Sequence, residues 1–243
     1  MSSIDDIFGA AFAEFFTTGV DEHIEVWING ELQDPLPPSY FFRGYDDMPD
    51  LEQIGLACCG KKVLDVGAAA GCHSLWLQEN GHDVVAVEIS PLACDVMRKR
   101  GVNQVVCANF FDLEPDPVYD TVLLLMNGLG MGQDVQGTID LLQHAAKFLK
   151  PGGDIVGDSS DIAYFYEDED AAQKKGLSLQ PPFDHYYGKV HFKLKWKDVE
   201  SDFRWIYPDP QLLAFAAKTN QLDYTVVAEG PHHDYLCAFR NQR

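Results

Sequence analysis

The sequence predicts an α/β protein with a doubly wound sheet, and three observations support this fold class. Apolar, strand-like segments alternate with amphipathic, helix-like segments between Lys61 and Ser159. Within them, Val122 to Met126 is a continuous apolar run, as expected for a strand buried on both faces of a parallel sheet. The first strand of the series leads into a turn of small residues, Gly67 to Gly71. Alternation of this kind builds parallel sheets through right-handed crossovers.

Composition narrows the classes of protein and partner. The 243 residues are 46% apolar and carry a formal net charge of −20, which fits one large domain and disfavours nucleic-acid and anionic-membrane partners. Six cysteines without a C-x-x-C pair indicate reduced thiols in a cytoplasmic protein. We expect no membrane span and no signal peptide, because long apolar runs and a basic N-terminus are both missing from the sequence. Nothing in the sequence indicates an oligomeric state.

The N-terminal segment is predicted to begin with an amphipathic helix. Its apolar residues recur at helical spacing: Ile4, Ile7, Phe8, Ala11, Phe12, Phe15 and Phe16. Core packing is the default interpretation, and a lid over a cofactor cleft is the alternative. From Asn29 to Asp50, frequent Pro, Asp and Gly predict irregular structure. Arg43, within the aromatic run Tyr40 to Tyr45, is either a solvated surface residue or a clamp for a ligand carboxylate.

The strand that begins near Lys61 carries the strongest functional signal. It ends in Gly-x-Ala-x-Gly, which brings bare backbone N–H groups and a helix N-terminus to the strand's carboxyl end. Asp65 stands two residues before the first glycine, and Glu88 ends a second strand, Asp83 to Ile89. The spacing to Glu88 suits recognition of ribose hydroxyls. A tight loop without a ligand is the alternative, and the acidic residues favour a cofactor site.

The remaining alternation gives the order of elements. We expect helices at Ser74 to Asn80, Pro91 to Arg100 and Asp134 to Leu149, and strands at Val102 to Ala108, Tyr119 to Met126 and Asp154 to Ser159. Beyond Asp161 the alternation stops. We expect an acidic loop at Glu167 to Asp170, and a hairpin made of His191 to Trp196 and Phe203 to Tyr207. A helix at Pro210 to Thr219 should follow, and then two final strands, Tyr224 to Glu229 and Tyr235 to Arg240.

Three features together resemble the class I S-adenosylmethionine-dependent methyltransferases, in a branch that acts on small molecules. They are the run Leu64 to Gly71, the acidic end of the second strand, and Lys150-Pro151-Gly152-Gly153 before the fifth. The resemblance covers Lys61 to the C-terminus. It implies a seven-stranded sheet of order 3-2-1-4-5-7-6 with the last strand antiparallel. It also implies a methyltransferase domain at 56–243, with an acceptor-side insertion at 162–207 and an N-terminal helical or lid segment at 1–55.

The resemblance further implies S-adenosylmethionine as the cofactor and S-adenosylhomocysteine as its product. The cofactor-binding positions that it implies are Asp65, Gly67, Ala68, Ala69, Gly71, Glu88, Ile89, Asn109 and Phe110. Arg43 and Asn127 are two further candidates for cofactor binding. Glu88 would accept from both ribose hydroxyls, Ile89 would pack on the adenine, and Asn109 with Phe110 would hold its edge and face. Many relatives carry Asp at the Asn109 position.

Two other functions fit parts of the sequence. A nicotinamide-dependent oxidoreductase would need glycine at Ala69 and a small residue at Cys72, so its fingerprint fits poorly. A module that binds the cofactor without turnover is the second alternative, and detection of methyl transfer would exclude it.

The acceptor side is expected at the carboxyl ends of the fourth and fifth strands. Methyl transfer needs alignment and a dry site, with a base only when the acceptor holds a proton. Candidate catalytic residues are Asp158, Asp161 and Tyr187, with aromatic neighbours Tyr186, Trp205 and Tyr207. A strand-end turn with a helix cap is the competing interpretation of the two aspartates.

No metal site is predicted, because Asn127 stands where metal-dependent relatives carry Asp and His232-His233 fits an edge-strand turn. Asn127 to Gly130 also lacks the two prolines typical of enzymes that methylate amines of DNA bases. The predicted hairpin carries Lys189, Lys193, Lys195 and Lys197. We therefore predict a small-molecule acceptor enclosed by the N-terminal segment and this hairpin.

Overall fold

The computed structural model describes residues 6–165 and 185–241. The acidic loop Glu167 to Asp170, and with it part of the predicted insertion 162–207, lies outside these residues. Backbone contacts divide the chain into two compact units. Unit 1 comprises Met1–Met48, Lys61–Glu114 and His191–Phe203, and unit 2 comprises Pro49–Gly60, Pro115–Val190 and Arg204–Arg243. The predicted boundary between residues 55 and 56 stays a prediction.

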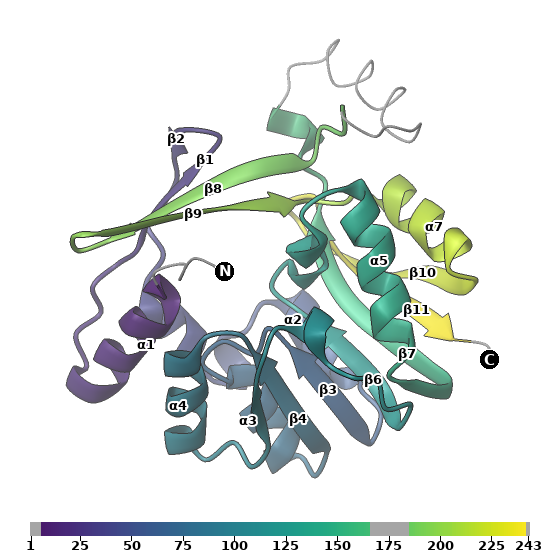
Figure 1. The fold of residues 1–243 in the computed structure, drawn as a ribbon, viewed down its shortest axis with the longest axis horizontal. Helices are drawn as coiled ribbons and strands as arrows, with labels where there is room; N and C mark the ends of the chain where they lie inside the picture. The colour runs from purple at the N-terminus through teal and green to yellow at the C-terminus, as the bar shows by residue number, and fades with distance from the viewer. Residues whose placement is uncertain (1–5, 166–184, 242–243) are drawn as a thin grey trace. The chain divides into compact units, whose positions relative to one another are not determined.

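Unit 1 contains the strand and turn that carry the predicted cofactor site. Its elements are α1 (Ile7–Thr18), β1 (Glu25–Ile28), β2 (Glu31–Leu32), η1 (Pro38–Phe42), η2 (Tyr45–Asp47), β3 (Lys62–Val66), α3 (Cys72–Glu79), β4 (Asp83–Glu88), α4 (Pro91–Arg100), β5 (Val105–Cys107), η3 (Phe110–Asp112) and most of β8 (Lys189–Trp196) and β9 (Val199–Ile206). In this unit α1 packs beside α4 (Figure 1).

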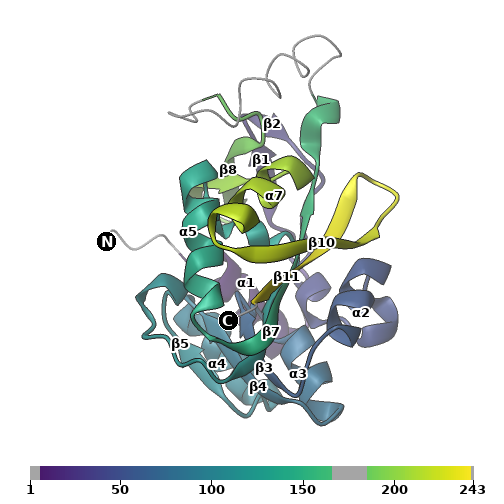
Figure 2. The ribbon, with the colours of Figure 1, turned by 90° about the vertical axis from the view of Figure 1, so that its right-hand side faces the viewer.

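Unit 2 contains the predicted acceptor-side strands. Its elements are α2 (Asp50–Ala57), β6 (Tyr119–Leu124), η4 (Gly128–Gly132), α5 (Val135–Ala146), β7 (Leu149–Ser160), η5 (Ile162–Phe165), α7 (Pro210–Thr219), β10 (Leu222–Glu229) and β11 (Asp234–Asn241). Helices α5 and α7 pack on each other, and α7 also packs on β10, as Figure 2 shows beside the yellow hairpin β10–β11.

Among the described residues, the larger sheet has seven strands in the order β10-β11-β7-β6-β3-β4-β5. The pairs β3–β4, β4–β5 and β6–β7 are parallel, whereas β11 pairs antiparallel with both β7 and β10. This arrangement confirms the predicted order 3-2-1-4-5-7-6 with an antiparallel last strand.

Local capping explains the two helices whose bounds were predicted correctly. Ser90 accepts from the Ala93 backbone N–H at the start of α4, and Pro91 occupies the first helical position. Asp209 accepts in the same way from the backbone N–H of Leu212, ahead of Pro210 in α7. These helices therefore begin where short-range chemistry places them.

Several predicted bounds were wrong. Strand β5 is only Val105–Cys107, because Val102 is still bonded to Met97 beyond the end of α4. Strand β6 stops at Leu124, and the two residues Met126 and Asn127 follow with φ of 62° and 58°.

The turn Lys150 to Gly153 falls inside β7, which starts at Leu149, and α5 ends at Ala146. The pairing of β6 with β7 shifts register next to this turn. Helix α1 begins at Ile7, and Ile4 lies outside the described residues.

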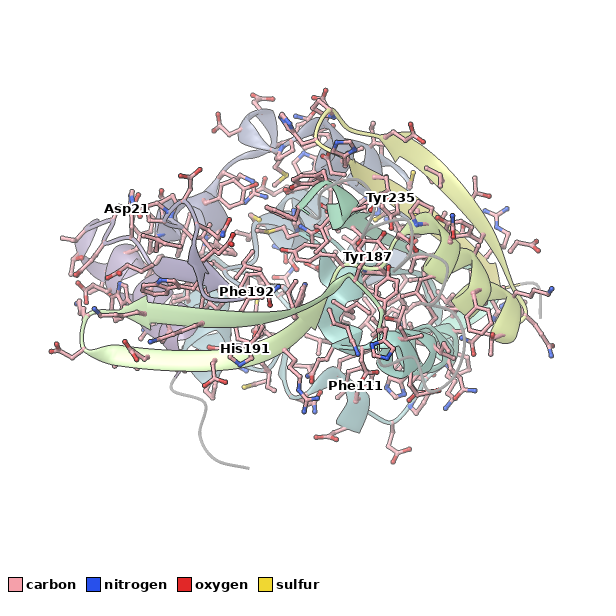
Figure 3. The ribbon with its side chains drawn as sticks, turned by 90° about the horizontal axis from the view of Figure 1, so that it is seen from above. Asp21, Phe111, Tyr187, His191, Phe192 and Tyr235 are labelled. Carbon is pink, nitrogen blue, oxygen red and sulfur yellow. The ribbon has the colours of Figure 1, made fainter. Side chains whose placement is uncertain are left out.

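A second sheet was not predicted. It has the order β2-β1-β8-β9, so the predicted hairpin β8–β9 exists and its first strand also pairs antiparallel with β1. Figure 3 shows β8 and β9 as a long two-stranded ribbon, with His191 and Phe192 labelled on β8. The apolar stripe of α1 packs on this sheet, in a core cluster of Ile7, Ala11, Ile24, Val26, Leu194 and Trp196. The stripe is thus core packing in unit 1.

Candidate functional site

The turn after β3 is held in one conformation by left-handed residues and by hydrogen bonds to β4. Gly67, Ala69 and Gly71 have φ of 75°, 50° and 86°. The backbone N–H groups of Gly67 and Ala68 both donate to the Val87 carbonyl, at 2.9 and 3.1 Å. Small residues therefore line a turn whose backbone is fixed at the carboxyl end of two parallel strands.

Asp65 lies beneath this turn as a buried carboxylate. It is 2% exposed and accepts a hydrogen bond of 2.5 Å from the Ser74 hydroxyl in the first turn of α3. Burial raises the pKa of the Asp65 carboxyl, and the charge of His73 and the Ser74 hydroxyl act in the opposite direction. Asp65 thus ties α3 to the end of β3.

Glu88 is oriented against the turn by two backbone donors. Its Oε2 accepts from the Ala69 N–H and its Oε1 accepts from the Ser90 N–H, both at 2.9 Å. Burial raises the pKa of Glu88, while the bonds from Ser90 and Ala69 lower it. A carboxylate has about four lone-pair sites, so an oriented carboxylate can also accept from a ligand's hydroxyl pair.

The predicted adenine contacts differ in exposure. Ile89 is 62% exposed, whereas Phe110 is 3% exposed. Asn109 caps the short helix η3, and its Oδ1 accepts from the Phe111 N–H at 3.2 Å. The Phe111 ring is 38% exposed and was not predicted as a site residue.

Arg43 is half-buried. It belongs to unit 1, as do Asp65 and Glu88. Its guanidinium lies 3.9 Å above the centroid of the Tyr40 ring, and Nη1 donates to the Tyr40 carbonyl. Stacking of this kind fixes the plane of the guanidinium. Arg43 is therefore an ordered cation, as a clamp for a carboxylate requires.

Arg100 contacts the turn and was not among the predicted site residues. The sequence places it only at the end of a predicted helix, but its Nη1 donates to the Ala70 carbonyl of the turn at 2.5 Å. A signal for this was present in the sequence. Arg100 continues the i, i+3, i+4, i+7 spacing of the buried residues Ala93, Val96 and Met97, so its side chain starts on the inner face of α4.

In unit 2, the structure brings Asn127 and Asp158 together. The backbone N–H of Asn127 donates to Asp158 Oδ1 at 2.9 Å, and the Ser160 hydroxyl donates to Asn127 Oδ1 at 3.1 Å. Asn127 has a left-handed φ of 58°, and its backbone N–H points to Asp158 of β7. The carboxyl ends of β6 and β7 thus share one polar network.

Asp161 and Tyr187 also meet in unit 2, with a partner that was not predicted. The Tyr187 hydroxyl lies 2.7 Å from Asp161 Oδ1 and 3.0 Å from Asp209 Oδ2. Tyr187, labelled in Figure 3, and Asp209 are each 3% exposed. Burial raises the pKa of Tyr187 well above its ordinary value, and the charges of its acidic neighbours add to the effect.

Asp161 also accepts from the Ala163 N–H at 2.9 Å, as the competing turn interpretation expects. Asp209 was missed because its pattern in the sequence is only that of a helix cap. Its backbone N–H donates to the Tyr186 hydroxyl at 2.6 Å, and that hydroxyl donates to the Tyr207 carbonyl at 3.2 Å. Trp205 packs against η4, where a Cβ at Gly130 would lie 2.0 Å from its Nε1.

The lysines of the β8–β9 hairpin make surface ion pairs. Lys193 lies 2.9 Å from Glu200, Lys195 lies 3.8 Å from Glu25, and Lys197 pairs with acidic residues of the N-terminal segment. Such exposed pairs contribute little to stability, because solvent screens the charges and both long side chains must be ordered.

Within the described ranges, no group of three His, Cys, Asp or Glu side chains is arranged to hold a metal ion. In the same ranges, each helix is too short or too polar to cross a membrane. The six cysteines all fall in the described part of the chain, and no disulfide joins any of them.

Comparison with known proteins identifies the family. A family model described as a methyltransferase domain matches residues 63–153. A SAM-dependent methyltransferase from Bacteroides fragilis, solved in complex with S-adenosyl-L-homocysteine, is 35% identical with a TM-score of 0.86, and the match covers 98% of this chain and 96% of that one. The CcbJ methyltransferase from Streptomyces caelestis, 17% identical with a TM-score of 0.65 over 98% of this chain and 100% of its own, shares the fold.

Among curated proteins, the cypemycin N-terminal methyltransferase of a Streptomyces species is 37% identical over 109 residues. That match covers 44% of this chain and 44% of the relative, so it spans less than half of the relative's length. The match to the Bacteroides fragilis protein extends over nearly the whole of both chains, and the chain therefore belongs to the S-adenosylmethionine-dependent methyltransferases.

Proposed function

We propose that this protein transfers a methyl group from S-adenosylmethionine to a small-molecule acceptor. The observation that carries the proposal is the near full-length match to a methyltransferase solved with S-adenosyl-L-homocysteine. The geometry of unit 1 supports it, because Glu88 is held in a fixed orientation beside a turn that carries no bulky side chain.

The residues of unit 1 fit the parts of the cofactor. The small side chains and left-handed backbone of residues 67–71 leave room for a ligand close to the main chain. Glu88 would accept from the ribose hydroxyls, Ile89 with Asn109 and Phe110 would bound the adenine, and Arg43 would hold a carboxylate. When bound, S-adenosylmethionine supplies an electrophilic methyl group on a cationic sulfur.

On the acceptor side, we assign Asp161 as the candidate base and Tyr187 as the residue that orients it. An acceptor heteroatom that carries a proton must release it, and an oriented carboxylate can take it up. The short Tyr187–Asp161 contact fixes the carboxylate, and Asp209 holds the same hydroxyl from the other side. Asp158, bonded to the Asn127 backbone, is the second candidate.

Charge supports a small-molecule acceptor, because a net charge of −20 opposes binding to a phosphate backbone. Six thiols without a disulfide support a cytoplasmic location.

Titration calorimetry with S-adenosylhomocysteine tests the cofactor assignment. We expect binding by the wild type, weakened by about 1–3 kcal/mol in Glu88→Ala through lost charged hydrogen bonds. Glu79→Ala, at the exposed end of α3, is the control and should bind as the wild type does. Binding of NAD without a response to either S-adenosyl ligand would contradict the proposal.

Turnover is tested by mass spectrometry on a panel of amine, hydroxyl and thiol acceptors incubated with S-adenosylmethionine. A methylated product excludes a module that only binds the cofactor. With such an acceptor, Asp161→Asn should lower kcat and leave binding of S-adenosylhomocysteine unchanged. Equal kcat in this variant and the wild type would remove Asp161 as the base.

A further inference from the structure

Arg100 connects the cofactor turn to the N-terminal segment through main-chain carbonyls. Its Nη1 donates to the Ala70 carbonyl at 2.5 Å and lies 3.5 Å from the Phe41 carbonyl. Its Nη2 lies 3.4 Å from the Phe42 carbonyl. One guanidinium therefore holds the turn of residues 67–71 and the end of η1 side by side, which the fixed fork of five N–H donors permits.

The segment from Phe41 to Tyr45 is anchored at both ends within unit 1. At its start, the Phe42 ring lies 4.6 Å below the Arg100 guanidinium, and the Phe15 ring of α1 packs against Phe42 at 4.9 Å. At its end, Tyr45 stacks on Trp76 of α3, with ring centroids 4.6 Å apart and an interplanar angle of 13°. The segment is thus attached to α1, α3 and α4.

Arg43 lies between these two anchors. Before it in the chain, the carbonyls of Phe41 and Phe42 contact Arg100. After it, the Tyr45 ring stacks on Trp76 of α3. The Phe41 and Phe42 carbonyls share the Arg100 guanidinium with the Ala70 carbonyl, so the backbone just before Arg43 lies beside the turn where the methionine part of the cofactor is expected. The carboxylate of that part needs a cation in a protein of net charge −20, and a stacked guanidinium matches its planar geometry.

We infer that Arg100 is a positioning residue for cofactor binding: it holds the Phe41–Tyr45 segment on the turn and so presents Arg43 to the cofactor's amino-acid carboxylate. This inference rests on the proposed function. Arg100 itself binds protein carbonyls, whereas Arg43 binds the ligand. Loss of Arg100 should therefore act only on ligands that carry the amino-acid part.

A pair of ligands separates this role from general stabilisation. S-Adenosylhomocysteine carries the amino-acid part, and 5′-methylthioadenosine has the same nucleoside and thioether without it. In calorimetry, Arg100→Ala should weaken binding of S-adenosylhomocysteine by about 10- to 100-fold and leave that of 5′-methylthioadenosine within about twofold. Arg98→Ala is the matched control, because Arg98 lies at the same end of α4 and pairs with Asp95 at 3.0 Å.

Arg43→Ala should show the same selective loss. The double variant Arg43→Ala/Arg100→Ala should bind S-adenosylhomocysteine no more weakly than Arg43→Ala alone, because Arg100 acts through Arg43. Arg100→Lys should recover part of the affinity, because an ammonium can reach the Ala70 carbonyl but cannot bind the carbonyls of Ala70, Phe41 and Phe42 at once. It also serves as the test variant if Arg100→Ala fails to fold.

Equal weakening of both ligands, or additive losses in the double variant, would overturn the inference. A wild type that binds neither ligand would instead overturn the proposed function. The two failures are therefore distinguishable in one experiment.

Discussion

Gly71 is a position where the turn tolerates no side chain, for two separate reasons. Its φ of +86° disfavours any residue with a Cβ, and a Cβ there would lie 2.9 Å from Met97 Cγ and 3.1 Å from Val102 Cγ2. Gly101, at the end of α4, shares the first reason but not the second. Its φ is +98°, and a Cβ added there would stand more than 4 Å from any side chain or backbone that the structure describes beyond its two chain neighbours.

The two glycines give a matched pair of variants. We expect Gly101→Ala to lower the free energy of unfolding by about 1–2 kcal/mol, the cost of a left-handed alanine. Gly71→Ala should lose a further amount of about 1–3 kcal/mol through overpacking. Urea denaturation measures both. Equal losses of unfolding free energy in the two variants would show that α4 moves aside, so that the contact between Met97 and a Cβ at residue 71 does not destabilise the protein.

Tyr187 predicts how stability depends on alkaline pH. Burial raises its pKa in the folded protein, and burial also raises the pKa of Tyr207 to about 12. In the unfolded chain tyrosine titrates near pH ~10. The folded state therefore holds the proton more tightly, so this stability is fully present below about pH 10 and is lost as the pH rises above it.

We expect Tyr187→Phe to lose less stability than the wild type between about pH 9 and pH 11. At neutral pH the variant should be less stable by about 1–3 kcal/mol, because Asp209 is left buried without this hydroxyl. Urea midpoints across this pH range provide the measurement. A Tyr187→Phe profile parallel to that of the wild type would contradict the expectation.

At the scale of elements, α1 and α4 are joined through their N-terminal caps. Asp6 accepts from the Gly9 N–H and caps α1, Ser90 caps α4, and the Ser90 hydroxyl donates to Asp6 Oδ2 at 2.6 Å. The two helices approach so closely that a Cβ at Gly9 would lie 2.2 Å from Ser90 Oγ. The Ser90 N–H also donates to Glu88, so this contact between the helices adjoins the carboxylate that is predicted to bind the ribose hydroxyls.

A double-mutant cycle tests this contact. Gly9→Ala should destabilise the protein by about 1–3 kcal/mol through overpacking, and Ser90→Ala by about 1 kcal/mol through the lost cap. In the Ser90→Ala background Gly9→Ala should cost less, because the hydroxyl that it meets has gone. Thermal or urea unfolding of the four proteins gives the coupling energy. Additive losses would show that the helices separate rather than clash.

The sequence predicted those elements whose signals are local. Helices α4 and α7 start at a capping residue followed by proline, and the turn after β3 is defined by its own small residues. Strand β1 was not predicted, because it is ordered by pairing with β8, which lies far along the chain. Some predicted site residues do meet: Glu88 binds the Ala69 N–H, Asp158 binds the Asn127 N–H and Tyr187 contacts Asp161. The roles of all the predicted site residues stay predictions. Arg100 and Asp209 were missed because helix-end patterns account for both residues.

At the scale of the whole molecule, charge is the dominant property. The chain carries 38 acidic and 18 basic residues, and several of the cations are used in surface pairs such as Arg240 with Asp154. The excess negative charge repels itself in the compact state and favours the expanded one. Mobile ions screen this repulsion, because the Debye length falls from about 30 Å at 0.01 M salt to about 10 Å at 0.1 M.

We therefore expect the urea midpoint to rise when sodium chloride is increased from about 0.01 M to about 0.1 M at pH 7. The control is the same titration at the pH where the net charge vanishes, where the dependence on salt should flatten. A midpoint that falls with salt at pH 7 would mean that attractive surface pairs outweigh the net repulsion.

The pairing of β1 with β8 also has a consequence for synthesis on the ribosome. The Trp196 indole N–H donates to the Glu22 carbonyl across 174 positions of the chain. At about 5–20 residues per second, translation leaves roughly 10 to 35 s in which β1 has emerged and its partner strand does not yet exist. During that interval the strand edge and the apolar face of α1 are exposed to other nascent chains, so this protein's yield should depend on chaperones that bind early in translation.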